Sequence, residues 1–288
     1  MVSADTLTGI KQLIRFDKPI GTYLLLWPTY WALWVAAEGF PSLHLFIVFS
    51  LGVFVMRSAG CAINDIADRK VDGKVKRTNK RPLVSGLLTT KQALFVFFSL
   101  LFVALGLVLT LNNYTIMLSF VAVGLAASYP FMKRVTHLPQ FVLGAAFSWS
   151  IPMAFAATNE TIPTVAWLLF ACNLLWTVAY DTMYAMVDRD DDLKIGVKST
   201  AILFGSWDKK IIGGLQVGCI VLLTLVGLML SFDSYYYLSV VMAGTLFFMQ
   251  QKMIKERDRD QCFKAFLNNH YALLIVFIGI AMQYLSLN

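Results

Sequence analysis

Nine apolar segments, each about 20 residues long, limit what this sequence can fold into. A helix needs about 20 apolar residues to cross the hydrocarbon core of a bilayer, and these segments lack the alternating pattern of a membrane β-strand. The sequence therefore predicts an all-α integral membrane protein that forms one domain over residues 1–288. The nine predicted spans are residues 20–37, 43–63, 92–111, 114–131, 139–157, 163–180, 211–231, 234–250 and 268–286.

The composition and the first segment agree with a membrane protein. The chain is 58% hydrophobic and 14% charged, whereas about a quarter of the residues of a typical soluble domain are charged. Residues 1–19 are polar and amphipathic and lack the apolar core of a cleavable signal, so we expect them to lie on the membrane surface. The cysteines show no metal-binding spacing and are interpreted as small apolar residues of the packing: Cys61, Cys172, Cys219 and Cys262.

The distribution of charge predicts the orientation of the chain. All 24 Lys and Arg residues lie before the first span, in every second connection, or, for Arg57, near the inner end of the second span. The other connections hold Glu38, Glu160 and Asp233 and no cation. Cytoplasmic loops carry the excess of cations, so the N-terminus is predicted to be cytoplasmic and the number of spans odd. The excess of Lys and Arg over Asp and Glu is explained by the membrane topology and by attraction to anionic lipid, so no nucleic-acid partner is predicted.

Two inner connections repeat one charged pattern. The stretches "DRKVDGK", from Asp68, and "DRDDDLK", from Asp188, both fit D-R-x-x-D-x-K. Each follows an apolar span on the same side, and the two lie four spans apart. This placement predicts a parallel internal repeat, residues 20–131 against 139–250, followed by a ninth helix at 268–286.

The spacing of the acidic residues predicts a metal site. If the second span continues inward as a helix, Asn64, Asp68 and Asp72 lie on one face, together with Arg57. Facing carboxylates repel one another, and Mg²⁺ relieves this repulsion by binding carboxylates and substrate phosphates together. The second helix presents a matching face, with Asp181, Tyr184, Asp188 and Asp192.

Cations around these acidic residues favour a phosphate-bearing substrate. Phosphate oxygens need positive charge beyond that of the metal, and a membrane setting suggests a diphosphate attached to a lipid. An ordinary solvated surface is the alternative interpretation of such charged loops. Tyr129 precedes Lys133 by four residues and either reaches the inner mouth of the site or is an interfacial aromatic. The candidate cations are Lys74, Lys133, Arg134, Lys194 and Lys198.

Arg57 lies several residues inside an apolar span. An unpaired cation there costs about 2.5–3.5 kcal/mol on insertion scales, so Arg57 needs an anionic partner. That partner is either an aspartate of the chain or a carboxylate of the substrate, and the sequence leaves both open.

The motifs resemble those of the UbiA-type membrane prenyltransferases. "NDIADRKVD" fits the N-D-x-x-D-x-x-x-D signature of that family, "DTMYAMVDRDDD" fits its second aspartate-rich motif, and "YPFMK" fits its Y-x-x-x-K element. The flanking stretches "KRTNKRPLVSG" and "DLKIGVKSTAILFG" are similar to the bacterial 4-hydroxybenzoate polyprenyltransferase branch. The likeness extends over nearly the whole chain.

The resemblance implies a nine-helix bundle around a central cavity that faces the cytoplasm, in the bacterial inner membrane. It implies transfer of a polyprenyl group from polyprenyl diphosphate to the 3-position of 4-hydroxybenzoate, with Mg²⁺, in ubiquinone biosynthesis. Arg57 would bind the benzoate carboxylate, and Asp68 or Asp188 would accept the phenol proton. Tyr129 and Tyr184 would contact substrate, and the cations named above would contact phosphate. The metal ligands would be Asn64, Asp68, Asp188 and Asp192, supported by Asp72 and Asp181.

Two alternatives differ from this function. A relative of the same family could prenylate another acceptor, such as homogentisate, a naphthoate, haem or a non-aromatic lipid. A secondary transporter is the alternative from another class, but it should carry ionisable groups near mid-membrane in both halves. Here the carboxylates cluster at the inner ends of the spans, which argues against transport.

Overall fold

The computed structural model describes residues 4–70, 72–74 and 78–286, without the side chain of Lys74. Within these residues every regular element is helical, and no strand is present. The elements are α1 (Ala4–Leu13), α2 (Ile20–Ala36), α3 (Leu43–Asp68), η1 (Asp72–Lys74), α4 (Thr90–Val108), α5 (Asn113–Val135), α6 (Pro139–Ser148), α7 (Ser150–Asn159), α8 (Thr164–Ile195), α9 (Thr200–Phe204), η2 (Gly205–Trp207), α10 (Asp208–Met229), α11 (Ser234–Met253) and α12 (Arg259–Leu285).

Each predicted span overlaps a helix or a helix pair, and the all-α fold is confirmed. Seven of the described segments are long and apolar enough to cross a membrane. The other two are α2, which has 17 residues, and α11, which has polar residues at both ends: Ser234 and three tyrosines in its first turn, and Gln250, Gln251 and Lys252 in its last. The chain is a multi-pass membrane protein, while the count of nine spans and the side of the N-terminus stay predictions.

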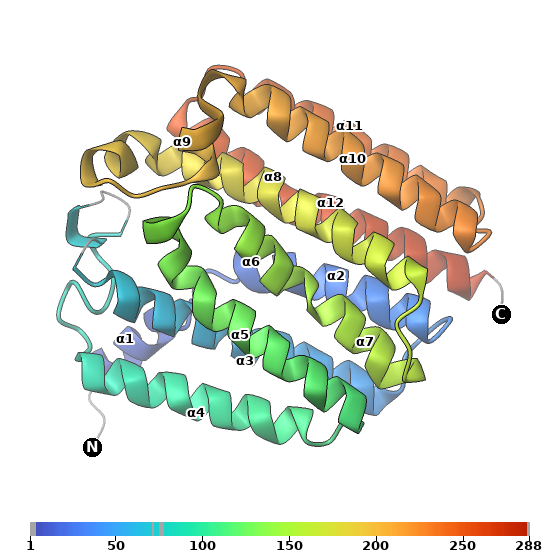
Figure 1. Cartoon of the computed structure of the whole chain (residues 1–288), viewed down its shortest axis with the longest axis horizontal. Coiled ribbons are helices and arrows are strands. Elements are labelled where there is room, and N and C mark those ends of the chain that lie inside the picture. Colours follow the sequence, from blue (N-terminus) through green and yellow to red (C-terminus); the bar gives the residue numbers. More distant parts are fainter. Residues whose placement is uncertain (1–3, 71, 75–77, 287–288) are drawn as a thin grey trace.

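The helices run side by side, with α4 at one edge of the bundle and α10 and α11 at the opposite edge (Figure 1). The core lies where α2, α8 and α12 pack together. Trp31 and Trp176 are fully buried there and their rings tilt against each other at 5.6 Å. Both indole N–H groups are satisfied, because Trp31 donates to the Leu273 carbonyl and Trp176 to Asn269 Oδ1. Buried indoles need such partners, so these bonds fix how the three helices pack.

Polar residues at the N-cap positions mark where some of the helices begin. Asn112 accepts a hydrogen bond from the Thr115 N–H and so caps α5, and Asp233 precedes α11. The predicted fifth span is divided at Trp149 into α6 and α7. Pro152 explains this division, because it has no N–H to donate to the Ser148 carbonyl four residues earlier.

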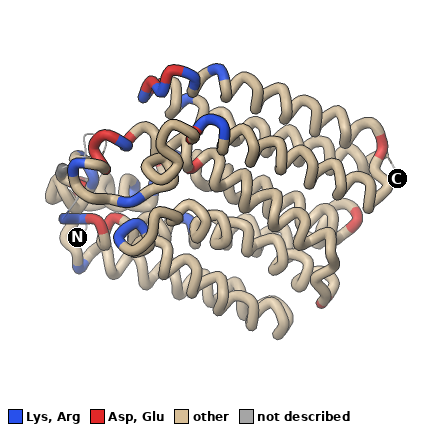
Figure 2. The backbone as a smooth tube through the Cα atoms, turned by 45° about the horizontal axis from the view of Figure 1, so that its top comes forward, with Lys and Arg blue, Asp and Glu red and all other residues tan. Residues whose placement is uncertain are grey.

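The surface is divided between an apolar flank and a charged end. Phe95 and Phe102 on α4 and Phe120 on α5 each expose more than 70% of their surface. A continuous face of this kind suits contact with lipid. Figure 2 shows Lys and Arg gathered at one end of the bundle, and only acidic residues among the charges at the other end. The connections that carry Lys and Arg in the sequence therefore lie together at one end of the bundle, and the connections without cations lie at the other.

Candidate active site

The first acidic motif does not lie on one continuous helix, so that expectation is wrong. Helix α3 ends at Asp68, and Asp72 begins the short helix η1. Gly73 disfavours a longer helix by about 1 kcal/mol relative to alanine. Arg81 Nη1 also draws Asp72 away by pairing with its Oδ2 at 2.7 Å. Asn64 and Asp68 share the final turns of α3, whereas Asp72 is positioned by the connection that follows.

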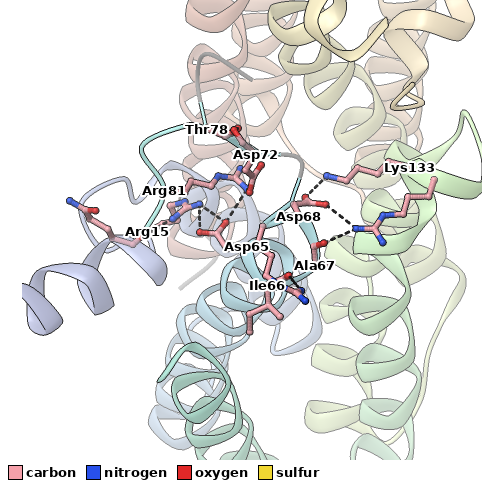
Figure 3. Close-up of polar contacts among 12 residues, drawn as sticks. Arg15, Asp65, Ile66, Ala67, Asp68, Asp72, Thr78, Arg81 and Lys133 are labelled. Carbon is pink, nitrogen blue, oxygen red and sulfur yellow. Dashed lines mark hydrogen bonds and ion pairs between the residues drawn. The ribbon is translucent and has the colours of Figure 1, made fainter. Parts of the chain in front are cut away.

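Asp68 is almost completely buried at the end of α3 and contacts the end of α5. Lys133 Nζ pairs with Asp68 Oδ2, and Arg134 donates to the Ala67 carbonyl at 2.6 Å (Figure 3). Among the described residues Asp68 Oδ1 has no hydrogen-bond partner, and Arg134 Nη2 lies 3.7 Å from it. A buried carboxylate oxygen is costly to leave unsatisfied. This oxygen is therefore available to a ligand.

Opposing effects act on the pKa of the Asp72 carboxyl. Burial raises the pKa of its carboxyl above the ordinary value, Arg81 lowers that pKa, and the nearby carboxylates of Asp68 and Asp65 raise it again. The three acidic side chains of this motif are thus close enough to repel one another. Added positive charge would lower this repulsion.

The second acidic motif does lie on one continuous helix, as expected. Helix α8 runs through the motif to Ile195 and ends at Gly196, which has the positive φ of 73° typical of a helix C-terminus. Asp188 is buried, and Asp181, Tyr184 and Asp192 are half-buried along the same helix. Each of these side chains has an interaction partner in the folded chain.

The end of α5 joins the two motifs. Its Lys133 side chain pairs with Asp68 of the first motif, and its Lys133 carbonyl accepts the Lys198 N–H at 3.0 Å. Lys198 Nζ also donates to the Val135 carbonyl. The predicted cations therefore meet at one place, except that Lys194 is exposed and the side chain of Lys74 lies outside the described part of the structure.

Arg57 is half-buried on α3, and its Nε is shielded from solvent with no hydrogen-bond partner among the described residues. Its Nη1 contacts Cys61 Sγ. Its electrostatic neighbours are the hydroxyls of Tyr129, Tyr180 and Tyr184 and the guanidinium of Arg15. Among the described side chains, no carboxylate forms an ion pair with Arg57. This environment favours an anionic ligand over an internal aspartate as its partner.

The donors fit a hard divalent cation, although the described residues hold no preformed cluster. No three His, Cys, Asp or Glu side chains among them are close enough to hold a metal ion. The unsatisfied Oδ1 of Asp68 is the observation that suits a metal ligand. Carboxylate and amide oxygens, as on Asp68, Asp188 and Asn64, are the donors that Mg²⁺ prefers. The four cysteines are free and buried, as the sequence predicted.

Sequence reasoning missed four residues that shape this region. Arg15 and Arg81 pair with Asp65, and Gly21 lies directly against the guanidinium of Arg57. The only signal in the sequence was the position of Asp65 around the helix: it follows Asn64 by one residue, so its side chain is rotated by about 100° from the face that holds Asn64 and Asp68. Its partners lie far away in the sequence, so the phase alone does not identify them.

Comparison with known proteins gives one consistent result. Residues 25–278 match the UbiA prenyltransferase family. The chain is 62% identical over 277 residues to the 4-hydroxybenzoate octaprenyltransferase of Colwellia psychrerythraea, covering 96% of each protein.

Solved structures share the fold at lower identity. A UbiA homolog from Aeropyrum pernix K1 in its apo form superposes with a TM-score of 0.80 at 23% identity, covering 90% of this chain and 97% of that one. A UbiA homolog from Archaeoglobus fulgidus bound to GPP and Mg²⁺ gives a TM-score of 0.71 at 16% identity, covering 95% and 99%.

Proposed function

The chain belongs to the UbiA prenyltransferase family, and we propose that it transfers a polyprenyl group from polyprenyl diphosphate to the 3-position of 4-hydroxybenzoate. The reaction releases diphosphate and serves ubiquinone biosynthesis. Curated relatives at about 60% identity over nearly the full chain are 4-hydroxybenzoate octaprenyltransferases.

The observation that supports an acid as the acceptor is the guanidinium of Arg57: its buried Nε has no hydrogen-bond partner and no carboxylate pairs with it among the described residues, and Tyr129, Tyr180 and Tyr184 are among its electrostatic neighbours. Asp68 follows 11 residues later on α3, about three helical turns nearer the charged end. An aromatic acid bound by Arg57 through its carboxylate would direct its phenol end toward the acidic motifs. The tail of a polyprenyl diphosphate would lie in or near the lipid.

Mg²⁺ bound at the acidic motifs would neutralise the diphosphate and so stabilise it as a leaving group. Asn64, Asp68, Asp188 and Asp192 are the proposed ligands, with Asp72 and Asp181 in support. Solved relatives bind Mg²⁺ together with GPP or DMAPP. The proposed phosphate contacts are Lys74, Lys133, Arg134, Lys194 and Lys198.

The residues of the chain then direct the transfer. As the bond between C1 of the prenyl group and the diphosphate oxygen breaks, Lys133 and Arg134 balance the charge that develops on the leaving group. The ring carbon ortho to the phenol forms the new bond to C1, and its proton passes to the released diphosphate. Asp68 or Asp188 accepts the phenol proton, which raises the electron density of the ring. Tyr129 and Tyr184 border the acceptor and help to exclude water, which would capture the prenyl cation.

The separation of charge supports the location that we propose, a bacterial inner membrane with the active site on the cytoplasmic side. A different small aromatic acid is the remaining candidate acceptor, because Arg57 recognises a carboxylate and not the whole molecule.

The proposal is tested with purified protein in lipid, supplied with 4-hydroxybenzoate, octaprenyl diphosphate and Mg²⁺, with EDTA in a parallel sample. We expect a 3-prenylated product and one diphosphate per product, and loss of both when EDTA removes the metal. Mass spectrometry measures the product, and a coupled assay measures diphosphate. Folded protein that gives no product with this acceptor would contradict the assignment of 4-hydroxybenzoate, and an undiminished rate in EDTA would contradict the metal requirement.

Gly21→Ala is expected to displace Arg57 and to raise the KM for 4-hydroxybenzoate. A Cβ at position 21 would lie 2.6 Å from Arg57 Cζ and closer still to Nε and Nη2. The guanidinium must therefore move, and we expect an increase of about tenfold, since a misplacement of about 1 Å can cost up to 10²-fold. The KM for octaprenyl diphosphate should change little. Steady-state kinetics with each substrate varied in turn measures both values.

The matched control is Gly52→Ala. Gly52 also lies on a helix, α3, and the added methyl group would meet only open space. It should leave both KM values unchanged. An unchanged KM for 4-hydroxybenzoate in Gly21→Ala would show that the guanidinium does not need the space beside Gly21.

A further inference from the structure

Asp65 lies in the first acidic motif but is directed away from Asp68. Arg15 Nη2 contacts both of its carboxylate oxygens, at 2.7 and 3.0 Å, and Arg81 Nη1 lies 3.0 Å from Oδ1. The Asp65 side chain is 1% exposed. Two guanidinium groups therefore satisfy a carboxylate that is shielded from water, and Asp65 is not available to a metal.

Asp65 and Asp68 are three residues apart on the last turn of α3, and cations hold them from two sides. In Figure 3, Arg15 and Arg81 meet Asp65 on one side of the helix, and Lys133 meets Asp68 on the other. Arg15 Nη2 contacts both oxygens and Arg81 contacts Oδ1, so the orientation of the carboxylate is fixed as well as its position. Holding Asp65 therefore sets the rotation of the last turn, and with it the direction of Asp68.

Apolar packing supports this arrangement. Leu13 of α1 is fully buried in a small cluster with Ala62 and Ile66 of α3 and with Leu88 and Ala93. Arg15 follows Leu13 by two residues, so the same contact that seats α1 brings its guanidinium to Asp65. The segment that begins the chain is thus packed against the turn that carries Asp68.

Arg81 extends the network to the connection after α3. Its Nη1 contacts Asp65 Oδ1 and Asp72 Oδ2 at 3.0 and 2.7 Å. Thr78 Oγ1 donates to the Asp72 carbonyl in the same region. Because Arg81 also reaches Asp65, removal of Arg15 alone would not leave Asp65 as a buried charge without a partner.

The second motif has a comparable arrangement. Arg259, at the start of α12, contacts Asp191 and Asp190 at 3.3 and 3.2 Å. Arg189 approaches the buried Asp208, which Arg257 also holds at 2.7 Å. In both motifs, charged residues next to the proposed ligands are paired with partners from other elements.

We propose that Arg15 is a positioning residue for the metal and diphosphate site. Through Asp65 it keeps the last turn of α3 in the rotation that aims Asp68 at the ligand, so the turn that follows α1 contributes to the active site without touching substrate. This inference rests on the proposed function, because it assumes that Asp68 binds the metal.

The test compares Arg15→Gln with the wild type and with Lys18→Gln. Lys18 is exposed on the same segment, so its variant removes one positive charge without disturbing Asp65. We expect Arg15→Gln to raise the Mg²⁺ concentration for half-maximal activity by about 10- to 100-fold, the usual cost of losing a residue that orients a metal ligand. The KM for 4-hydroxybenzoate should stay unchanged, and Lys18→Gln should behave as wild type.

A binding measurement separates positioning from activity. Mn²⁺ is titrated into each variant with a non-reactive prenyl thiodiphosphate, and the free Mn²⁺ is followed by EPR. Arg15→Gln should weaken Mn²⁺ binding by the same factor as it raises the Mg²⁺ requirement. Arg15→Lys should recover part of the affinity, because it restores the charge but not the planar guanidinium that reaches both oxygens of Asp65.

A double-mutant cycle tests whether Arg15 acts through Asp65. Asp65→Asn should weaken Mn²⁺ binding as Arg15→Gln does, and the double variant should be little worse than either single one. Additive losses would show that Arg15 acts elsewhere. Lower thermal stability of Arg15→Gln with unchanged Mn²⁺ affinity would make Arg15 a structural residue only and overturn the inference. If the wild type itself binds no Mn²⁺ with the analogue, the proposed metal site fails rather than the role of Arg15 alone.

Discussion

Asp68→Ala and Asp188→Ala are each expected to lower kcat/KM by at least about a thousandfold, equivalent to ~4 kcal/mol of transition-state stabilisation. Each removes a proposed ligand of the metal that neutralises the diphosphate. Asp68 is buried with one oxygen unsatisfied, so its carboxylate is better suited to a ligand than to stabilising the fold. Product formation at saturating substrate and Mg²⁺ measures the loss, and circular dichroism with thermal unfolding checks the fold.

Two further variants make this result specific. Asp68→Asn keeps the shape of the side chain but removes its charge, and it should be nearly as inactive as Asp68→Ala. Asp260→Ala removes an exposed carboxylate at the same end of the bundle and should keep wild-type activity. Activity close to wild type in Asp68→Ala or Asp188→Ala would remove that residue from the metal site.

Arg57→Ala is expected to raise the KM for 4-hydroxybenzoate by about 10- to 100-fold, since a hydrogen bond to a charged group contributes about 1.5–3 kcal/mol. The KM for octaprenyl diphosphate should change little. The Nε of its guanidinium is buried and unsatisfied among the described residues, and Tyr129 and Tyr184 are among its electrostatic neighbours, which suits an anionic ligand at that depth. Initial rates with each substrate varied at a fixed excess of the other give the two constants.

An acceptor without the carboxylate provides the control. Phenol should be a poor substrate for the wild type, and Arg57→Ala should not make it poorer, because phenol has no group for Arg57 to bind. Equal increases in both KM values would instead indicate that Arg57 has an internal partner and maintains the shape of the site as a whole.

Features that depend on local composition could be predicted from the sequence. Continuous apolar segments identified the helices, because crossing a bilayer requires that length of apolar chain. The separation of cations along the chain predicted the charged end of the bundle seen in Figure 2. The spacing of Asp181, Tyr184, Asp188 and Asp192 correctly predicted one continuous helix, since α8 extends through all four.

The tertiary structure decided what each charged residue contacts. The helical spacing of Asn64, Asp68 and Asp72 predicted that α3 would continue to Asp72. The helix instead ends at Asp68, and Asp72 pairs with Arg81 in the connection that follows. Asp65 and Asp68 have the same chemistry, yet one is held by arginines and the other retains an unsatisfied oxygen. The physical reason is distance along the chain. Arg15 lies 50 residues from Asp65, and Lys133 lies 65 residues from Asp68. Periodicity reports the face on which a residue lies, but only the packing of α1 and α5 against α3 determines which cation meets that face.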